Sequence, residues 1–282
     1  MKQGARFGLH PALKARLGTG YSVPGCSVLD NRRILDAPMK VVVIIPAAGL
    51  GTRMASAPSA KGKKPAASKQ FTDLGGTPIL IHTLRKFAAS PDVSQVYVAL
   101  RSNEISTFRA RLEKEAKDIL QKKVHLVEGG EHRQHSVANA LAAVAAAPDD
   151  IVLVHDAVRP FVTEEIIRDV IHAAQKYGAA IAGLPAMDTV KQVERTAEGA
   201  LITATVPRER VVMAQTPQGF RYDVLKKAFD EATADGFIGT DEASLVERSR
   251  HEVAVVMGSP RNIKITTPAD LELAEFYLKA TS

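Results

Sequence analysis

Residues 40–54 read KVVVIIPAAGLGTRM. The apolar run at 41–45 is continuous and β-branched, which is typical of a parallel strand that is covered on both faces. Pro46 lacks a backbone N–H, so it is expected to end this strand. The stretch predicts a buried strand that leads directly into a glycine-rich turn.

The turn has the composition of an anion-binding loop. Ala47, Ala48, Gly49 and Gly51 have little or no side chain, so backbone N–H groups could approach a phosphate closely, and Arg53 adds a permanent positive charge. The spacing fits neither a Walker A loop nor the GxGxxG dinucleotide fingerprint. By itself, the loop is therefore compatible with a phosphate site or with an ordinary turn.

Composition limits the class of protein. The chain has 282 residues, is 45% hydrophobic and has a single cysteine, which excludes an internal disulfide and a cysteine-based zinc site. No apolar stretch approaches the ~20 residues of a membrane span. The net charge of +6 lies mainly before residue 41, where seven Lys/Arg face two Asp. We expect a cytoplasmic protein without a nucleic-acid or membrane partner.

Residues 1–38 lack sustained periodicity and contain scattered glycine and proline. We interpret them as a disordered N-terminal extension, and residues 39–282 as the functional domain. Residues 55–68, reading ASAPSAKGKKPAAS, predict a loop that is mobile without ligand.

Strand and helix patterns alternate along the rest of the domain. This order predicts an α/β fold with a Rossmann-like, mostly parallel sheet, helices on both faces, and ligands at the carboxyl ends of the strands. We expect strands at 95–100, 124–127, 151–154 and 179–184, and helices at 78–89 and 102–122 and after Ser136 and Thr163, with Thr77, Ser102, Ser136 and Thr163 at their N-termini.

Two loops at these carboxyl ends contain chemically distinctive residues. In GGEHRQHS, residues 129–136, the glycines permit close backbone approach, and two histidines without nearby cysteines or paired carboxylates are unlike a metal site. In VLVHDAVRP, residues 152–160, Asp156 follows a buried strand and could meet Mg²⁺ or a ligand hydroxyl. In the alternative interpretation, Asp156 only stabilises a turn and forms an ion pair with Arg159.

Two segments near the C-terminal half complete the pattern. Thr267, Pro268 and Asp270 predict a capped helix start, with Lys264 on a preceding strand. Residues 185–213 break the alternation and predict a β-hairpin arm that turns at Glu198-Gly199. Because isolated hairpins are marginally stable, the arm needs either a second subunit or its own domain as a packing surface.

Eight strings together resemble one family, the 2-C-methyl-D-erythritol 4-phosphate cytidylyltransferases of the non-mevalonate isoprenoid pathway. The resemblance covers residues 39–282, although the 55–68 loop is longer than is usual in that family. The strings are PAAGLGTRM, SKQF, GGEHRQHS, VLVHDAVRP, DTVK, TVPRERVVMAQTPQGF, GTDEAS and RNIKIT.

The resemblance implies an enzyme that transfers the cytidylyl group of CTP to methylerythritol phosphate and releases pyrophosphate, with Mg²⁺ as cofactor and a homodimer formed through the arm. It also implies roles for individual residues. Nucleotide-binding residues would be Ala47, Ala48, Gly49, Gly51, Gly130, Glu131 and Ser136; catalytic residues Arg53, Lys69, Arg208 and Lys264; and substrate-binding residues Asp156, Thr189, Arg208, Thr216 and Lys264, with Asp156 also considered as a metal ligand.

Two alternatives remain at this point. One is a transferase for another polyol or sugar phosphate, such as ribitol 5-phosphate. The other is a nucleotide-binding module without catalytic activity. The absence of a third glycine and the presence of Lys69 disfavour this alternative.

Overall fold

The computed structural model describes residues 39–49, 68–117, 119 and 123–281. Residues 39–282 form one compact unit. Gly51, Arg53, the 1–38 extension and most of the 55–68 loop lie outside the described residues, so the predictions made for them stay predictions.

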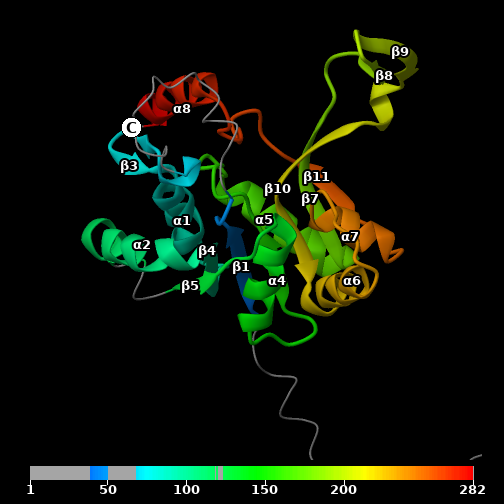
Figure 1. Ribbon diagram of the computed structural model, residues 1–282. Helices are drawn as coiled ribbons and strands as arrows, with labels where there is room; N and C mark the ends of the chain where they lie inside the picture. Colours follow the sequence, from blue (N-terminus) through cyan, green and yellow to red (C-terminus); the bar gives the residue numbers. More distant parts are fainter. Residues whose placement is uncertain (1–38, 50–67, 118, 120–122, 282) are drawn as a thin grey trace, which may run out of the picture. The chain divides into compact units, whose positions relative to one another are not determined.

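A seven-stranded sheet forms the centre of the described unit, in the order β11-β7-β10-β6-β1-β4-β5 (Figure 1). Neighbouring strands are parallel except at β10, which is antiparallel to both β6 and β7. The predicted mostly parallel sheet is thus confirmed. The strands are β1 (Val41–Pro46), β4 (Gln95–Leu100), β5 (Val124–Glu128), β6 (Ile151–Val154), β7 (Ala179–Pro185), β10 (Val212–Arg221) and β11 (Ala254–Met257).

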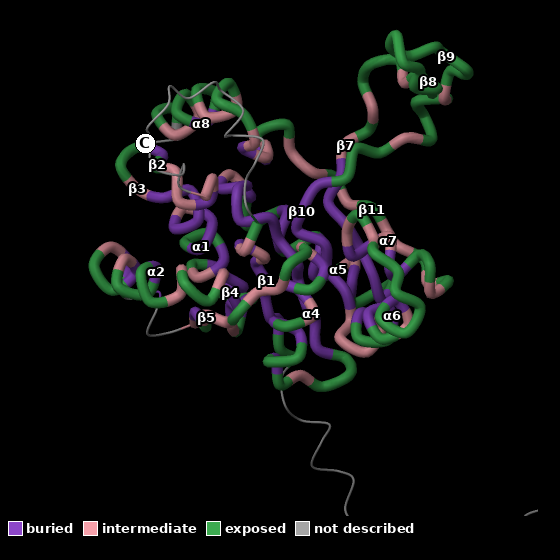
Figure 2. Tube along the Cα trace, viewed as in Figure 1, coloured by how far each residue is buried: buried purple, intermediate pink, exposed green. Residues whose placement is uncertain are grey.

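Strand β1 shows why the sheet is covered on both sides. Val41, Val43 and Ile45 pack into one core cluster, whereas Val42 and Ile44 pack into another, because successive side chains point to opposite faces. Figure 2 shows the resulting buried centre. One cluster includes side chains of α1 (Ile79–Ala89), α2 (Ser102–Glu115) and α5 (Glu164–Tyr177), and the other those of α4 (Arg133–Ala143), α6 (Tyr222–Ala234) and α7 (Glu242–Arg248).

A third, smaller cluster packs α8 (Pro268–Thr281) against the pair formed by β2 (Asp73–Leu74) and β3 (Thr77–Pro78). Its buried members include Leu74, Val158 and Ala274. None of the helices in the described ranges is long and apolar enough to cross a membrane.

Several predicted element ends were wrong. Pro46 lies within β1, paired with Ala99, so the strand ends one residue later than expected. Thr77 belongs to a short strand, and α1 begins at Ile79, one residue later than expected. Helix α2 follows Arg101 as its N-cap and ends at Glu115, well before the expected 122.

Helix α4 follows His132 as its N-cap, so Ser136 lies within the first turn and is not the cap. By contrast, Thr163 caps α5 as predicted, accepting a hydrogen bond from the Ile166 amide at 3.3 Å. The expected start of α8 is also present, since Asp270 accepts hydrogen bonds from the Thr266 and Thr267 amides, both at 2.8 Å.

The arm leaves the sheet between β7 and β10. It consists of β8 (Val190–Thr196) and β9 (Gly199–Val206), paired with each other, and a 3-10 turn at Arg208–Arg210. The hairpin turn lies at Ala197–Glu198, one residue earlier than predicted. Nearly all arm residues are exposed, and Figure 1 shows β8 and β9 projecting away from the sheet.

Candidate functional site

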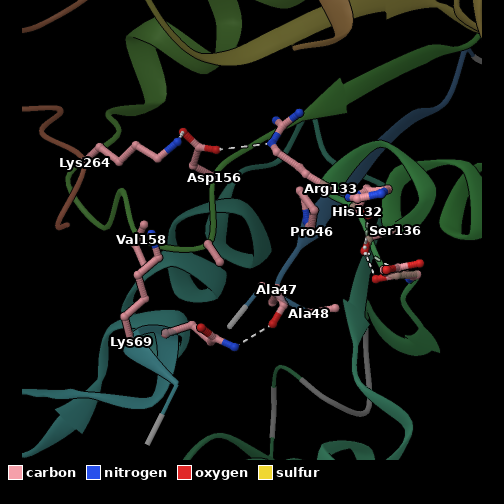
Figure 3. A pocket seen from close by; sticks show the side chains of 15 residues that line it. Pro46, Ala47, Ala48, Lys69, His132, Arg133, Ser136, Asp156, Val158 and Lys264 are labelled. Atoms are coloured by element: carbon pink, nitrogen blue, oxygen red, sulfur yellow. Dashed lines mark hydrogen bonds and ion pairs between the residues drawn. The ribbon is translucent and has the colours of Figure 1, made fainter. Parts of the chain in front are cut away.

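A pocket lies at the carboxyl ends of β1, β5 and β6 (Figure 3). We call it the central pocket. It collects residues from the β1 turn, the short 3-10 helix Lys69–Phe71, the loop before α4, the end of β6 and the segment before α8, as expected for a parallel sheet. Its lining residues are Pro46, Ala47, Ala48, Gly49, Lys69, Gln70, Gly130, Glu131, His132, Arg133, Ser136, Asp156, Ala157, Val158 and Lys264.

Two side chains from other segments hold the start of the β1 turn in place. The buried Gln70 side chain donates to the Ala47 carbonyl at 2.6 Å, and Arg101 Nε donates to the Ala48 carbonyl at 2.9 Å. The Ala47 amide donates to the Ala99 carbonyl at 2.8 Å. These contacts fix the Ala47 and Ala48 carbonyls at the start of the turn.

The loop before α4 packs closely on this turn. A Cβ at Gly129 would lie only 2.6 Å from the Ala48 Cβ, so a larger residue could not occupy the position without a shift. Ser136 is 2% exposed, and its Oγ accepts a hydrogen bond from the Gly130 amide at 3.1 Å. The same hydroxyl contacts the His132 carbonyl at 3.1 Å. Ser136 therefore shapes the loop that lines the pocket.

Asp156 sits among three cations at the other side of the pocket. Its Oδ2 lies 3.0 Å from both Lys264 Nζ and Arg159 Nε, and its Oδ1 lies 3.7 Å from Arg133 Nε. Figure 3 shows Lys264, Asp156 and Arg133 in a row. Burial alone would raise the pKa of Asp156, but the three cations together lower it well below its ordinary value. The carboxylate is therefore ionised at neutral pH.

Arg133 is held by a buried carboxylate from α7. Its Nη1 donates to both oxygens of Glu242, at 2.6 and 2.8 Å, and Glu242 is 1% exposed. Burial raises the pKa of Glu242, and Arg133 opposes that shift. Burial also tends to lower the pKa of Arg133, but Glu242 and Asp156 more than offset this effect. The ion pair fixes Arg133 so that its guanidinium faces Asp156.

Beneath Asp156, the antiparallel strand β10 contributes Thr216. Thr216 Oγ1 accepts a hydrogen bond from the Asp156 amide at 3.0 Å and lies 3.1 Å from His155 Nδ1. The other ring nitrogen of His155 lies 3.1 Å from the Arg159 carbonyl, which can only accept, so Nε2 donates and Nδ1 accepts from Thr216. Burial lowers the pKa of His155 to about 4, which keeps the ring neutral.

A second hollow adjoins the central pocket, and we call it the outer pocket. The two share Arg133, Asp156 and Lys264. The outer pocket extends towards β10 and α7, and its other lining residues are Arg159, Ala214, Gln215, Thr216, Gln218, Thr240 and Asp241. Two neighbouring ligands could thus meet at the shared charged residues.

The structure brings most of the predicted site residues together. Lys264 does so from an irregular segment between β11 and α8, which corrects its predicted place on a strand. Thr189 and Arg208 instead lie exposed at the base of the arm, where Arg208 donates to the Met187 carbonyl at 3.0 Å, and neither lines the two pockets. Those lining a pocket are Ala47, Ala48, Gly49, Lys69, Gly130, Glu131, Ser136, Asp156, Thr216 and Lys264.

Sequence reasoning missed Arg133, which lines both pockets, and Glu242, which holds Arg133 in place. Both lie within the motifs GGEHRQHS and GTDEAS, and their charge in glycine-containing loops was the available signal. Their pairing joins positions 109 residues apart, which no local pattern could indicate.

The described residues do not form a metal site by themselves. No group of three or more His, Cys, Asp or Glu in the described ranges is placed to hold a metal ion. Asp156, considered as a metal ligand, has both oxygens directed at cations. This donor set fits a magnesium ion only if substrate phosphates supply most of its ligands.

Comparison with known proteins gives a consistent result. Residues 41–280 match the family model for 2-C-methyl-D-erythritol 4-phosphate cytidylyltransferase. Proteins of that name from Acidobacterium capsulatum and Solibacter usitatus are 59% and 52% identical, each over 86% of this chain and over 99% and 96% of their own lengths. A crystal structure of that name from Thermus thermophilus is similar with a TM-score of 0.65 and 36% identity, covering 86% of this chain and 100% of its own.

Proposed function

The chain belongs to the 2-C-methyl-D-erythritol 4-phosphate cytidylyltransferase family, and we propose that its two adjoining pockets hold the two substrates of that enzyme. The protein is a nucleotidyltransferase that transfers the cytidylyl group of CTP to 2-C-methyl-D-erythritol 4-phosphate, giving 4-diphosphocytidyl-2-C-methyl-D-erythritol and pyrophosphate. The observation that carries the proposal is the charged group Arg133, Asp156 and Lys264, which both pockets share.

The reaction forms one P–O bond and breaks another. An oxygen of the methylerythritol phosphate attacks the α-phosphorus of CTP, and the bond from that phosphorus to the bridging oxygen of the leaving pyrophosphate breaks with its electron pair. The attacking phosphate is already ionised near neutral pH, so no general base is needed. Catalysis then consists mainly of positioning and of stabilising negative charge.

We assign the nucleotide to the central pocket. The backbone of Ala47, Ala48 and Gly49 faces that pocket from β1, and Gly130 and Glu131 face it from the loop that Ser136 shapes. Lys69 lines the same pocket, so its ammonium would contact the triphosphate. Gly51 and Arg53, which lie beyond the described residues, are assigned there by their place in the same motif.

We assign the methylerythritol phosphate to the outer pocket. Asp156 is ionised and accepts hydrogen bonds, so it suits the polyol hydroxyls, whereas Lys264 and Arg159 suit the phosphate. Lys264 lines both pockets and would also stabilise charge at the reacting phosphates. Thr216 contributes to the pocket wall.

Magnesium is proposed as the cofactor. When bound, it would neutralise charge on the phosphates of CTP. Because Asp156 is surrounded by cations, we infer that the triphosphate supplies most of the metal's ligands and that Asp156 contributes at most one.

We further propose a homodimer, formed through the arm, in the cytoplasm. Exposed apolar side chains run along the arm and the adjoining part of β10, and such surface favours burial against a partner. A two-fold interface would let Thr189 and Arg208 reach the outer pocket of the other subunit, which explains why they lie away from their own. The exposed apolar residues are Met187, Val193, Leu201, Ile202, Val212 and Met213.

The test is release of pyrophosphate by the purified chain with Mg²⁺, each of the four ribonucleoside triphosphates, and either methylerythritol phosphate or ribitol 5-phosphate. We expect turnover only with CTP and methylerythritol phosphate. Equal turnover of ribitol 5-phosphate would contradict the assigned substrate. CTP binding without any pyrophosphate release would contradict catalysis itself.

A further inference from the structure

A separate groove lies between α1, the start of α5, the segment before α8, and α8 itself. We call it the basic groove; it has a volume of about 590 Å³ and shares no lining residue with the central or outer pocket. That volume is within the range of sites that bind small ligands. The groove is therefore large enough to hold a second molecule independently of the substrates.

The charged groups of the groove are mostly positive. Among the described residues, Arg85, Lys86 and Arg261 line it, and Glu164 is the one acidic lining residue. Glu164 already pairs with Arg168 outside the groove, at 2.8 Å. The net positive charge favours an anion.

His82 and the α5 terminus add polar groups to this site. His82 contributes no charge at neutral pH, because burial lowers its pKa. Thr163 is the N-cap of the 14-residue helix α5, so the positive end of the helix faces the groove, although Glu164 and Glu165 in its first turn offset part of that charge. The N-terminus of a helix also favours an anion, and phosphate in particular.

One wall of the groove is aromatic. Phe161 and Tyr277 meet edge to face, with ring centroids 5.7 Å apart, and the Arg261 guanidinium lies 5.6 Å from the centre of the Tyr277 ring. Both rings are only partly buried, so they offer apolar surface to a ligand. The groove thus combines a site for negative charge with a site for an apolar group.

In the described part of the chain, the Ser90 hydroxyl is an unpaired polar group next to the groove. Ser90 lines the groove and is 2% exposed, yet among the described residues its Oγ has no hydrogen-bond partner. Buried hydroxyls in proteins are nearly always hydrogen-bonded. Because this oxygen is inaccessible from the groove, a bound polar group could pair with it only after the Ser90 side chain rotates.

We propose that the basic groove is a second ligand site, which binds an organic phosphate that has an apolar group attached. The phosphate lies against Lys86, Arg261 and the start of α5, and the apolar group lies against Phe161 and Tyr277. A free inorganic phosphate makes only the first set of contacts, so it binds more weakly. The two substrates are assigned to the central and outer pockets, so the ligand of the basic groove is a separate molecule.

Isothermal titration calorimetry at pH 8 with phenyl phosphate as the probe tests the proposal. The protein is first saturated with CTP and methylerythritol phosphate in the presence of EDTA, so that both the central and the outer pocket are occupied while turnover is prevented. We expect saturable binding of one molecule per chain under these conditions. Arg261→Ala and Lys86→Ala should each weaken it by at least about tenfold, as should replacing the probe by inorganic phosphate.

Matched variants separate this site from the catalytic one. Arg109→Ala removes an equally exposed arginine from α2, and Lys69→Ala alters the central pocket, so both should bind phenyl phosphate normally. All variants are first shown to have the melting temperature of the unaltered protein. The proposal would be wrong if CTP or the Lys69→Ala substitution abolished binding of phenyl phosphate. It would also be wrong if neither Arg261→Ala nor Lys86→Ala changed that binding.

Discussion

Arg133 and Glu242 form a buried ion pair in which one guanidinium nitrogen donates to both carboxylate oxygens, at 2.6 and 2.8 Å. Glu242 touches neither pocket, whereas Arg133 lines both. The carboxylate therefore positions a cation that the substrates would meet.

The first prediction concerns this ion pair. Glu242→Gln removes the charge that holds Arg133, so we expect kcat/KM for methylerythritol phosphate to fall by about tenfold. Glu247→Gln, an exposed position on the same helix, is the control and should leave it unchanged. Equal rates for both variants in steady-state kinetics would show that Arg133 does not depend on Glu242.

The second prediction concerns Lys69. Lys69→Ala should lower kcat by on the order of a hundredfold or more while the fold is kept, because the lost charge acts mainly on the transition state. Pyrophosphate release measures the rate, and circular dichroism checks the fold. Lys227→Ala on α6 is the control. A near-normal rate would show that Lys69 does not contribute to catalysis.

The third prediction tests whether the arm completes the site of a second subunit. Lys69→Ala and Arg208→Ala should each be inactive alone but regain activity when co-expressed. Random mixing makes half of the dimers mixed, and each mixed dimer has one site with both lesions and one with neither, so roughly a quarter of sites recover. If mixed dimers form but no activity is recovered, the arm does not contribute to the active site of the other subunit.

The fourth prediction concerns His155 and pH. Its pKa is about 4 in the folded protein, against 6.5 for an unperturbed histidine, so between these values the unfolded chain binds more protons. The contribution of neutral His155 to the unfolding free energy is complete above pH 6.5 and is lost as pH falls towards 4. Full loss amounts to roughly 3 kcal/mol of unfolding free energy.

Urea unfolding at pH 7, 5.5 and 4.5 measures the slope of the unfolding free energy against pH. His155→Gln should reduce it, whereas His172→Gln, at an exposed position on α5, should not. An unchanged slope in His155→Gln would show that other groups cause the pH dependence.

The fifth prediction concerns residues 1–38. The family match begins at residue 41, so deleting 1–38 should leave kcat and KM unchanged within about twofold. Steady-state kinetics and the melting temperature of both forms measure this. A clear drop in either would assign the extension a structural role.

Local patterns predicted five parallel strands, β1, β4, β5, β6 and β7, but missed β10 and β11. The apolar run at 41–45 indicated β1 directly, because strands covered on both faces have continuous hydrophobic sequences. Strand β10 contains Thr216, Pro217, Gln218 and Gly219, which locally resemble a loop. Its place between β6 and β7 is decided by tertiary packing.

Local sequence patterns likewise located only part of the candidate site. Glycine loops and the aspartate after β6 could be located because their chemistry is local to a strand end. The resemblance grouped Asp156 with Thr216 and Lys264, but no local pattern indicated their contacts or the approach of Arg133, because these residues come from separate segments. Only the folded sheet brings those segments together.

The geometry at the base of the arm makes it a separable module. Val212 pairs with Pro185 in adjacent antiparallel strands, and the Ala186 amide donates to the Val211 carbonyl at 3.1 Å. The chain thus returns beside the point where it left the sheet, as at the mouth of a hairpin. An ancestral or engineered chain could lack residues 187–210 and close the gap with a short turn, so the arm can be lengthened, exchanged or removed during evolution without disturbing the sheet that holds the nucleotide.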